Sequence, residues 1–216
     1  VYLGFIFNII VMATVSLAAI KLGTVLMGLT PLQTILIAGL VTVAYSSLGG
    51  LKSILITDFF QFFLSLLGGI AAAYYALQHP AVGGLDGLIS HSNVIPKLNI
   101  FPNFHNPSEM LGLLIIPLAV QWWSVYYPGS EPGGGGYIAQ RMFAAKNENH
   151  AVGAVFFFNA AHFALRPWPW IIVGLASLIV FPDLASMKEA FPTASGVAAT
   201  DMAYPAMLTF LPTGLI

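Results

Sequence analysis

Three charged side chains stand in stretches of sequence that are otherwise apolar: Asp58, Glu131 and Arg166. An ionised side chain within a membrane-spanning helix costs about 2.5–3.5 kcal/mol on insertion scales, so it must pair, reach the interface or face a water-filled path. A carboxylate is a hard oxygen ligand suited to a cation. Asp58 is therefore a candidate for an ion path, unless it simply reaches the interface. Glu131 and Arg166 are candidates for a solute site, or for a structural ion pair with each other.

A second feature is the break in the apolar run WWSVYYPGSEPGGGGYIAQR, residues 122–141, which places two prolines, five glycines and a glutamate within 128–136. Non-helical backbone at membrane depth is tolerated only where it is buried in protein or lines a cavity. There it offers free carbonyl and amide groups, and discontinuous helices are typical of secondary transporters. Gly135, Gly136 and Tyr137 are therefore predicted to border a solute site. A kink without chemical use is the alternative.

A third feature is the run NAAHFALRPWPW, in which Asn159, His162 and Arg166 follow helical spacing and so are expected on one face. Pro167 and Pro169 come next, and prolines leave carbonyl groups of the preceding turn without helical partners. A neutral histidine can donate or accept a hydrogen bond near pH 7. His162 is therefore a candidate solute ligand, with a hydrogen bond to a neighbouring helix as the alternative.

The composition explains why these residues stand out. The chain of 216 residues is 58% hydrophobic and 7% charged, whereas a soluble domain carries about 25% charged residues. An all-α integral membrane protein is therefore expected. The net charge of −1 gives no reason to expect a nucleic-acid partner, and the absence of cysteine excludes disulfides and thiolate metal sites. The sequence holds no HExxH and no plausible Ser–His pair, so no enzyme is expected.

About five segments are apolar and long enough to span a bilayer: 1–27, 32–48, 54–77, 110–143 with the break near 128–136, and 151–181. A polar loop is expected between the third and fourth segments, and a short helix after the fifth. On the third segment a stripe of polar and small residues predicts close helix packing: Asp58, Gln61, Ser65, Gly68, Gly69 and Ala72. Basic residues near span ends weakly favour one side as cytoplasmic, namely Lys52, Arg141 and Lys146.

Three motifs resemble one known family, the sodium:solute symporters. The run AYSSLGGLKSILITDFFQ at 44–61 is similar to the family's Tyr-x-x-x-Gly-Gly-Leu followed by Thr-Asp-x-x-Gln. The run YIAQRMFAAKNENHA at 137–151 resembles the Gln-Arg-x-x-Ala-Ala-Lys that ends its sixth core helix. The run DMAYPAMLTFLPTGL at 201–215 is similar to the segment before its eighth helix.

The resemblance implies a five-plus-five inverted-repeat fold. Residues 1–216 would then be an internal fragment of one transporter domain, with core helices three to seven and the approach to the eighth. The family's sodium site lies between the first and eighth helices, so sodium would be bound mainly outside this chain. Asp58 matches an aspartate on the sodium path or at a second sodium site. Gly135, Gly136 and Tyr137 match the unwound part of the sixth helix, and His162 falls near a substrate-contacting position.

The expected function is sodium-coupled symport of a small polar solute by a multi-pass protein of the cell membrane, with a bacterial inner membrane favoured. Sodium, the solute and the lipid bilayer are the expected partners. The sequence PGSEPGGGG departs from the asparagine-containing version of the sugar transporters, which counts against a sugar. A channel, or a non-catalytic membrane subunit with an intramembrane polar relay, is the alternative.

Overall fold

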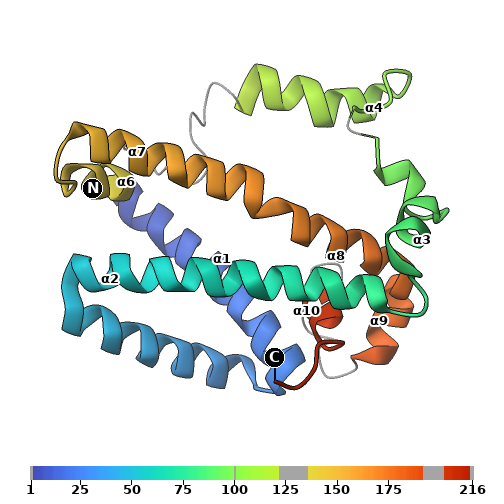
Figure 1. The fold of residues 1–216 in the computed structure, drawn as a ribbon, viewed down its shortest axis with the longest axis horizontal. Coiled ribbons are helices and arrows are strands. Elements are labelled where there is room, and N and C mark those ends of the chain that lie inside the picture. The colour runs from blue at the N-terminus through green and yellow to red at the C-terminus, as the bar shows by residue number, and fades with distance from the viewer. Residues whose placement is uncertain (1, 100, 122–135, 192–201, 215–216) are drawn as a thin grey trace. The chain divides into compact units, whose positions relative to one another are not determined.

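The structure is a computed structural model that describes residues 2–99, 101–121, 136–191 and 202–214. All regular elements in these ranges are helical (Figure 1). The chain divides into two compact units, one formed by Val1–Ala13 with Pro96–Ala161 and the other by Thr14–Ile95 with His162–Ile216.

The second unit contains the end of α1 (Tyr2–Met27) and all of α2 (Pro31–Gln78). A reciprocal capping box starts α2: Thr30 Oγ1 accepts from the amide of Gln33 at 3.3 Å, and Gln33 Oε1 accepts from the amide of Thr30 at 3.0 Å. This satisfies two amide groups that a helix start leaves without partners. Proline at the first helical position adds a pre-set φ. Thr30 and Pro31 therefore define the start of α2 locally.

The helix α2 is interrupted at Gly50, whose φ of 56° and ψ of −163° are not helical. Glycine adopts this region without the steric penalty of a Cβ. Figure 1 shows the ribbon of α2 reversing direction within its length, and the non-helical Gly50 divides α2 into a first arm, residues 31–49, and a second arm, residues 51–78. The expected segments 32–48 and 54–77 are thus confirmed as helices. They are joined by a single non-helical residue instead of a longer turn.

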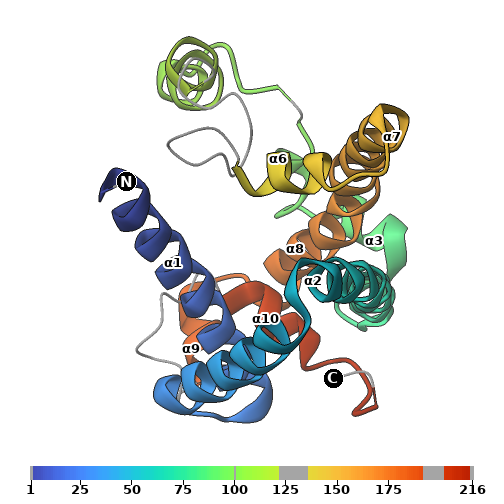
Figure 2. The ribbon, with the colours of Figure 1, turned by 90° about the vertical axis from the view of Figure 1, so that its left-hand side faces the viewer.

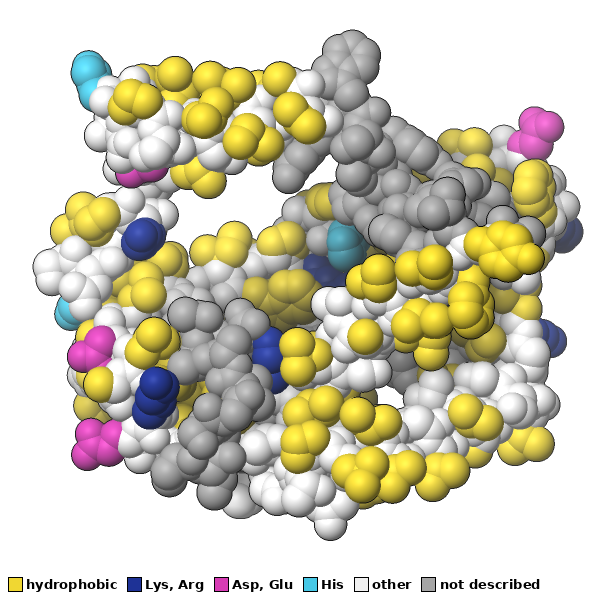
Figure 3. All heavy atoms as spheres, turned by 180° about the vertical axis from the view of Figure 1, so that it is seen from behind, with side chains coloured by type: hydrophobic (Ala, Val, Ile, Leu, Met, Phe, Trp, Pro, Cys, Tyr) yellow, Lys and Arg dark blue, Asp and Glu magenta, His cyan; other side chains and the backbone are white. Residues whose placement is uncertain are grey.

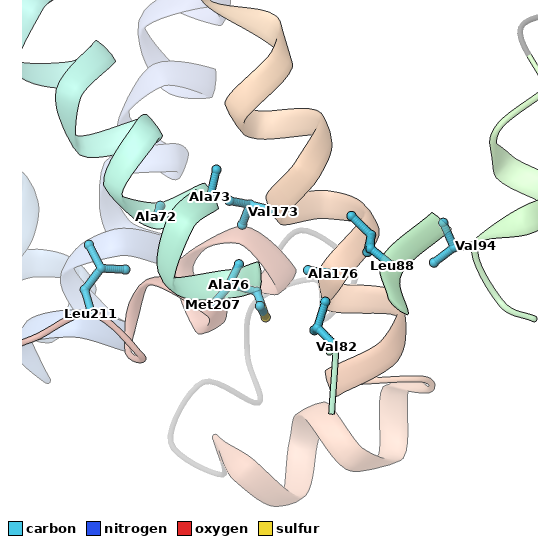
Figure 4. Close-up of a cluster of buried hydrophobic side chains, with 10 residues drawn as sticks. All are labelled: Ala72, Ala73, Ala76, Val82, Leu88, Val94, Val173, Ala176, Met207 and Leu211. Atoms are coloured by element: carbon cyan, nitrogen blue, oxygen red, sulfur yellow. The ribbon is translucent and has the colours of Figure 1, made fainter. Parts of the chain in front are cut away.

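The second arm of α2 packs against α8 (Pro167–Val180) and α10 (Ala203–Leu208), and the three helices lie side by side in Figures 1 and 2. Small residues at the contact allow close approach, as is usual between membrane helices. Figure 4 shows this core, which consists of Ala72, Ala73, Ala76, Val82, Leu88, Val94, Val173, Ala176, Met207 and Leu211. The expected small-residue stripe is therefore a packing surface from Gly69 onward.

The polar loop expected after the second arm is not extended chain. It contains α3 (Gly84–Ser90) and the 3-10 turn η1 (Ile95–Lys97). Its apolar side chains enter the core just described, and the side-chain amide of Asn93 donates to the carbonyl of Leu178 at 3.2 Å. The loop is therefore fixed to the end of α8.

A short helix, α9 (Leu184–Ala190), follows α8 and confirms the helix expected after the fifth segment. Asp183 caps it by accepting from the amide of Ser186 at 2.7 Å. The hydrogen bonds from Ser186 lower the pKa of the Asp183 carboxyl below its usual value. The cap is thus a charged acceptor at the positive end of a helix.

The first unit contains two helical stretches besides the start of α1. One is continuous from α4 (Pro107–Met110) through the π-helical segments η2 (Leu111–Ile115) and η3 (Pro117–Gln121). The other pairs α6 (Gly136–Phe143) with α7 (Glu148–Asn159), which is capped by Asn147. From α7 the chain continues through a π-helical segment, η4 (Ala160–Leu165), into α8.

The described helices expose large apolar side chains to their surroundings. Leu48 is 89% exposed, Leu64 73% and Phe156 75%. Figure 3 shows patches of hydrophobic side chains along the described helices, with few charged side chains among them. Helices long and apolar enough to cross a membrane are Asn8–Met27, Pro31–Gln78 and Glu148–Val180, with a shorter apolar stretch at Pro107–Val120. The all-α membrane class is therefore confirmed.

Candidate functional site

The clearest polar arrangement in the second unit is formed by Arg166, Trp170 and Tyr204, which we call the arginine cluster. Arg166 stands directly before Pro167, the first residue of α8, and Trp170 lies four residues later, one helical turn away. The guanidinium carbon of Arg166 lies 4.6 Å from the centre of the Trp170 ring. A cation over an indole face is attracted by the ring quadrupole. The tryptophan therefore stabilises the charge that the sequence places in an apolar helix.

Tyr204 joins this pair from α10, through the contact between α10 and α8. The indole of Trp170 lies next to its side chain. Burial raises the pKa of Tyr204 above its usual value of 10.0, whereas the neighbouring Trp170 indole and the charge of Arg166 act in the opposite direction. The phenol therefore keeps its proton at neutral pH and remains a hydrogen-bond donor.

One donor of the arginine cluster lacks an acceptor. The Nε atom of Arg166 is buried and, among the residues that the structure describes, has no hydrogen-bond partner. Leaving a buried donor unsatisfied costs about 1–3 kcal/mol, and more for a charged group. A group outside the described residues is therefore needed to complete the site.

A hollow of about 440 Å³ adjoins the cluster and is lined by Ser65, Trp170 and Tyr204. Its volume is within the range of small-molecule sites. On α2, Gly69 faces the same tryptophan, and a Cβ added there would lie 3.6 Å from the indole nitrogen. The hydroxyl of Ser65 donates to the carbonyl of Phe62 at 3.0 Å, so it can only accept a hydrogen bond from a group in the hollow.

His162 lies in η4 and is half-buried, with its ring 4.9 Å from that of Phe163 in an edge-to-face arrangement. The prediction that His162 shares one helical face with Asn159 and Arg166 assumed α-helical spacing. That assumption is wrong here, because η4 is π-helical and its hydrogen bonds join residues five apart. The side chain of Asn159 donates to Val155 of its own helix at 2.8 Å. The structure therefore brings Arg166 to Trp170 and Tyr204 rather than to that face.

Asp58 lies on the exposed side of the second arm of α2. It is seven residues before Ser65, which corresponds to about 10 Å along a helix axis. Its neighbour Thr57 donates to the carbonyls of Ser53 and Ile54 at 3.0 and 2.9 Å, so the lone pairs of that hydroxyl remain available as oxygen ligands. The candidate ion position is thus separate from the hollow.

The chain is 30% identical over 214 residues to the sodium/glucose cotransporter of Vibrio parahaemolyticus, an alignment that covers 92% of the chain. It is 29% identical over 201 residues to human sodium/myo-inositol cotransporter 2, covering 81% of the chain. It is 28% identical over 170 residues to mouse sodium-coupled monocarboxylate transporter 2, covering 77% of the chain. The chain belongs to the sodium:solute symporter family.

The chain spans about a third of the length of these curated relatives, 37% of the Vibrio protein and 28% of the human one. No family model matches the chain, and no solved structure matches it. The family assignment therefore rests on the curated relatives. It confirms the resemblance read from the three motifs.

Several of the predicted site residues lie at the edge of what the structure describes. Glu131 and Gly135 fall outside the described residues. Gly136 and Tyr137 are the first two residues of α6, so they are helical rather than part of an unwound stretch. The difference is one or two residues, which is the usual uncertainty of a helix boundary.

Two members of the arginine cluster were missed by the sequence predictions, namely Trp170 and Tyr204. Each stands in a motif that had been noticed for another reason: Trp170 in the run after Arg166, and Tyr204 in the Ala-Tyr-Pro of the third family motif. Within the described ranges, no group of three or more His, Cys, Asp or Glu side chains could hold a metal ion.

Proposed function

We propose that the complete protein carries out sodium-coupled symport of a small polar solute across a cell membrane. The observation that supports this most directly is the 30% identity over 214 residues to a protein named a sodium/glucose cotransporter. Relatives named for myo-inositol and for monocarboxylates are also sodium-coupled cotransporters. A bacterial inner membrane, with Lys52, Arg141 and Lys146 on the cytoplasmic side, is part of the proposal.

Sodium is proposed to bind mainly to parts of the complete protein outside this chain. Asp58 with Thr57 offers hard oxygen ligands of the kind that sodium takes, but two side chains do not complete a coordination shell. Asp58 is exposed on α2, which leaves room for ligands from other helices. Asp58 is therefore proposed to lie on the sodium path or at a second sodium site.

The solute is proposed to contact the broken helix and the half-buried polar residues that follow it. Gly135 and Gly136 would let a solute approach the peptide groups, with Tyr137 beside them. A second group of proposed contacts consists of Glu131, His162 and Arg166. Arg166 is the best supported of these, because its Nε is buried with no partner among the described residues.

Sodium-dependent uptake by the complete protein in liposomes tests the proposal. A saturable uptake of sugars, polyols, amino acids or carboxylates, stimulated by sodium and not by potassium, is expected. A channel or a non-catalytic subunit would instead give no saturation or no sodium dependence, and either result would contradict symport.

A matched pair of glycine variants tests the broken helix within the same assay. Gly136→Leu is expected to abolish solute binding while the protein still inserts. Gly153→Leu is the control, because a Cβ at Gly153 on α7 meets no atom within 4 Å. Normal solute affinity in a folded Gly136→Leu protein would show that the break serves packing alone.

A further inference from the structure

The loop after the second arm of α2 contains the same histidine turn twice. The sequence His-Pro-Ala-Val at 79–82 corresponds to His-Ser-Asn-Val at 91–94. His79 is the C-cap of α2, with φ of −61° and ψ of 132°, and His91 is the C-cap of α3, with φ of −74° and ψ of 136°. Each histidine therefore leads the chain out of a helix in the same extended conformation.

The hydrogen bonds of the two turns also correspond. The ring nitrogen Nδ1 of each histidine accepts from the amide two residues later, Ala81 in the first turn and Asn93 in the second, at 3.2 Å in both. The carbonyl of each histidine accepts from the amide of the valine three residues later, at 2.9 Å in both. An amide N–H only donates, so Nδ1 carries a lone pair and the ring proton lies on Nε2. Both turns therefore require a neutral imidazole.

Each turn positions side chains that fix the loop to α8. Val82 and Val94 end the two turns and are 2% and 0% exposed, and Figure 4 shows them in one cluster with buried residues of α8. Asn93, in the second turn, also donates its side-chain amide to the carbonyl of Leu178 at 3.2 Å. Closed turns thus hold the loop against the last part of α8.

The ring of the first histidine reaches the same end of α8 by another route. The His79 ring lies 4.7 Å from the ring of Phe210 in an edge-to-face arrangement. Phe210 in turn stacks at 6.2 Å on Phe181, the C-cap of α8. Both histidines are therefore linked to the end of one helix, and a change at either ring acts on that end.

The surroundings of the two turns in the described ranges hold few other titratable groups. Those on the elements packed against the turns or adjoining them are Tyr74 and Tyr75 on α2, Asp86 on α3, Lys97 in η1, Asp183 beyond α8 and Tyr204 on α10. Both histidines also stand at helix C-termini, where the partial negative charge of the macrodipole attracts a cation. A protonated ring is therefore acceptable at these positions, although it can no longer accept from an amide.

We propose that residues 79–95 form an acid-released clamp on the end of α8, the histidine clamp. Histidine is the side chain that ordinarily changes charge between about pH 5 and pH 8. Above this range both rings are neutral and both turns are closed. As the pH falls through it, each Nδ1 gains a proton and then faces an amide that is also a donor. Acid therefore opens both turns and frees the loop from α8. The clamp is independent of the proposed symport.

His150 offers a comparison within the chain, because its ring has the opposite role. Its Nδ1 lies 2.7 Å from Oδ1 of Asn147, which also accepts from the amide of His150 at 3.0 Å. A carboxamide oxygen only accepts, so this ring nitrogen donates. Protonation leaves that hydrogen bond in place. Acid should therefore loosen the histidine clamp and not the start of α7.

Hydrogen–deuterium exchange of the complete protein at pH 8 and pH 5 tests the clamp, with each rate divided by the intrinsic rate at the same pH. The protection of amides in 81–95 is expected to fall about fivefold at pH 5, a factor within the range given by the loss of one ordinary hydrogen bond. Protection at the start of α7 is expected to stay unchanged. Equal protection of 81–95 at the two pH values would overturn the proposal.

Asparagine variants separate the clamp from a general effect of acid. The side-chain oxygen of asparagine can accept from the amide two residues later, as Nδ1 does, but it does not titrate. The double variant His79→Asn with His91→Asn is therefore expected to stay protected at both pH values. Each single variant should remove the response of its own turn, which decides the question if the double variant does not fold.

Two further variants complete the test. His79→Ala with His91→Ala lacks both acceptors, so its loop is expected to exchange at pH 8 as the wild-type loop does at pH 5. His150→Asn is the matched control and should keep the full pH response of 81–95. An undiminished fall in protection at pH 5 in the folded asparagine variants would show that the two rings are not responsible, and the histidine clamp would be overturned.

Discussion

The second arm of α2 has two different surroundings along its length. Near its end, Ala72 and Ala76 are 2% and 1% exposed, because α8 and α10 cover them. Nearer Gly50, Phe60 and Leu64 are 68% and 73% exposed, and Asp58 is on the exposed side as well. One end is stabilised by this chain, whereas the other presents a surface for lipid or for further helices of the complete protein. Stability and transport should therefore respond differently to changes at the two ends.

The largest effect on stability is expected at the covered end. Met207 is 1% exposed within the core of α2, α8 and α10. Met207→Ala would leave a cavity there, and such substitutions cost about 2–5 kcal/mol. Leu64→Ala, at an exposed position of the same arm, is the control and is expected to change stability little. Thermal unfolding of the complete protein in detergent would measure both, and equal losses would remove the distinction between the two ends.

A smaller stability loss is expected where α1 meets the first arm of α2. A Cβ added at Gly23 would lie 2.8 Å from Cγ2 of Thr34, closer than carbon atoms normally approach. Gly23→Ala is therefore expected to cost about 1–3 kcal/mol by overpacking. Thr34→Ala removes the contacted atoms and should recover part of that loss in the double variant. Additive losses in a double-mutant cycle would show that the helices do not touch there.

The exposed end is expected to affect ion coupling more than stability. Asp58→Asn removes a charged oxygen ligand from the proposed sodium path. The sodium concentration for half-maximal uptake should rise roughly fivefold, the factor that follows from about 1 kcal/mol for a solvent-accessible charge contact. Solute affinity at saturating sodium should change less. An unchanged sodium activation curve would remove Asp58 from the path.

The smallest effect is expected at alkaline pH, where the arginine cluster should make the stability of the folded protein depend on pH. The folded-state pKa of Tyr204 is raised above its usual value of 10.0, chiefly by burial. The contribution of the protonated phenol to the free energy of unfolding is therefore complete below about pH 10, and it is lost as the pH rises through the higher folded-state pKa. Wild-type protein should lose stability relative to Tyr204→Phe over that range. Parallel pH profiles for the two proteins would contradict a buried, neutral phenol.

The sequence was sufficient to predict the helical segments within the described residues, because a long hydrophobic run is a local signal. It also predicted the packing stripe at Gly69 and Ala72. The contact of Tyr204 with Trp170 joins residues far apart in the chain, and no periodicity reports such a contact. The prediction that Asn159 and Arg166 share one helical face was wrong because η4 is π-helical, a rare geometry that sequence patterns do not signal. The prediction for Glu131 and Gly135 stays open.

The single non-helical residue Gly50 also determines the electrostatics at the turn of α2. The first arm ends there and the second begins, so the partial negative charge of one helix macrodipole lies beside the partial positive charge of the next. Lys52 is exposed in the first turn of the second arm, where its charge opposes that positive end by about 0.3–1 kcal/mol. Anionic lipid headgroups attract a basic residue by about 1 kcal/mol. On the membrane orientation proposed above, Lys52 would be stabilised by the membrane surface rather than by its own helix, and it would anchor the hairpin at the headgroup level.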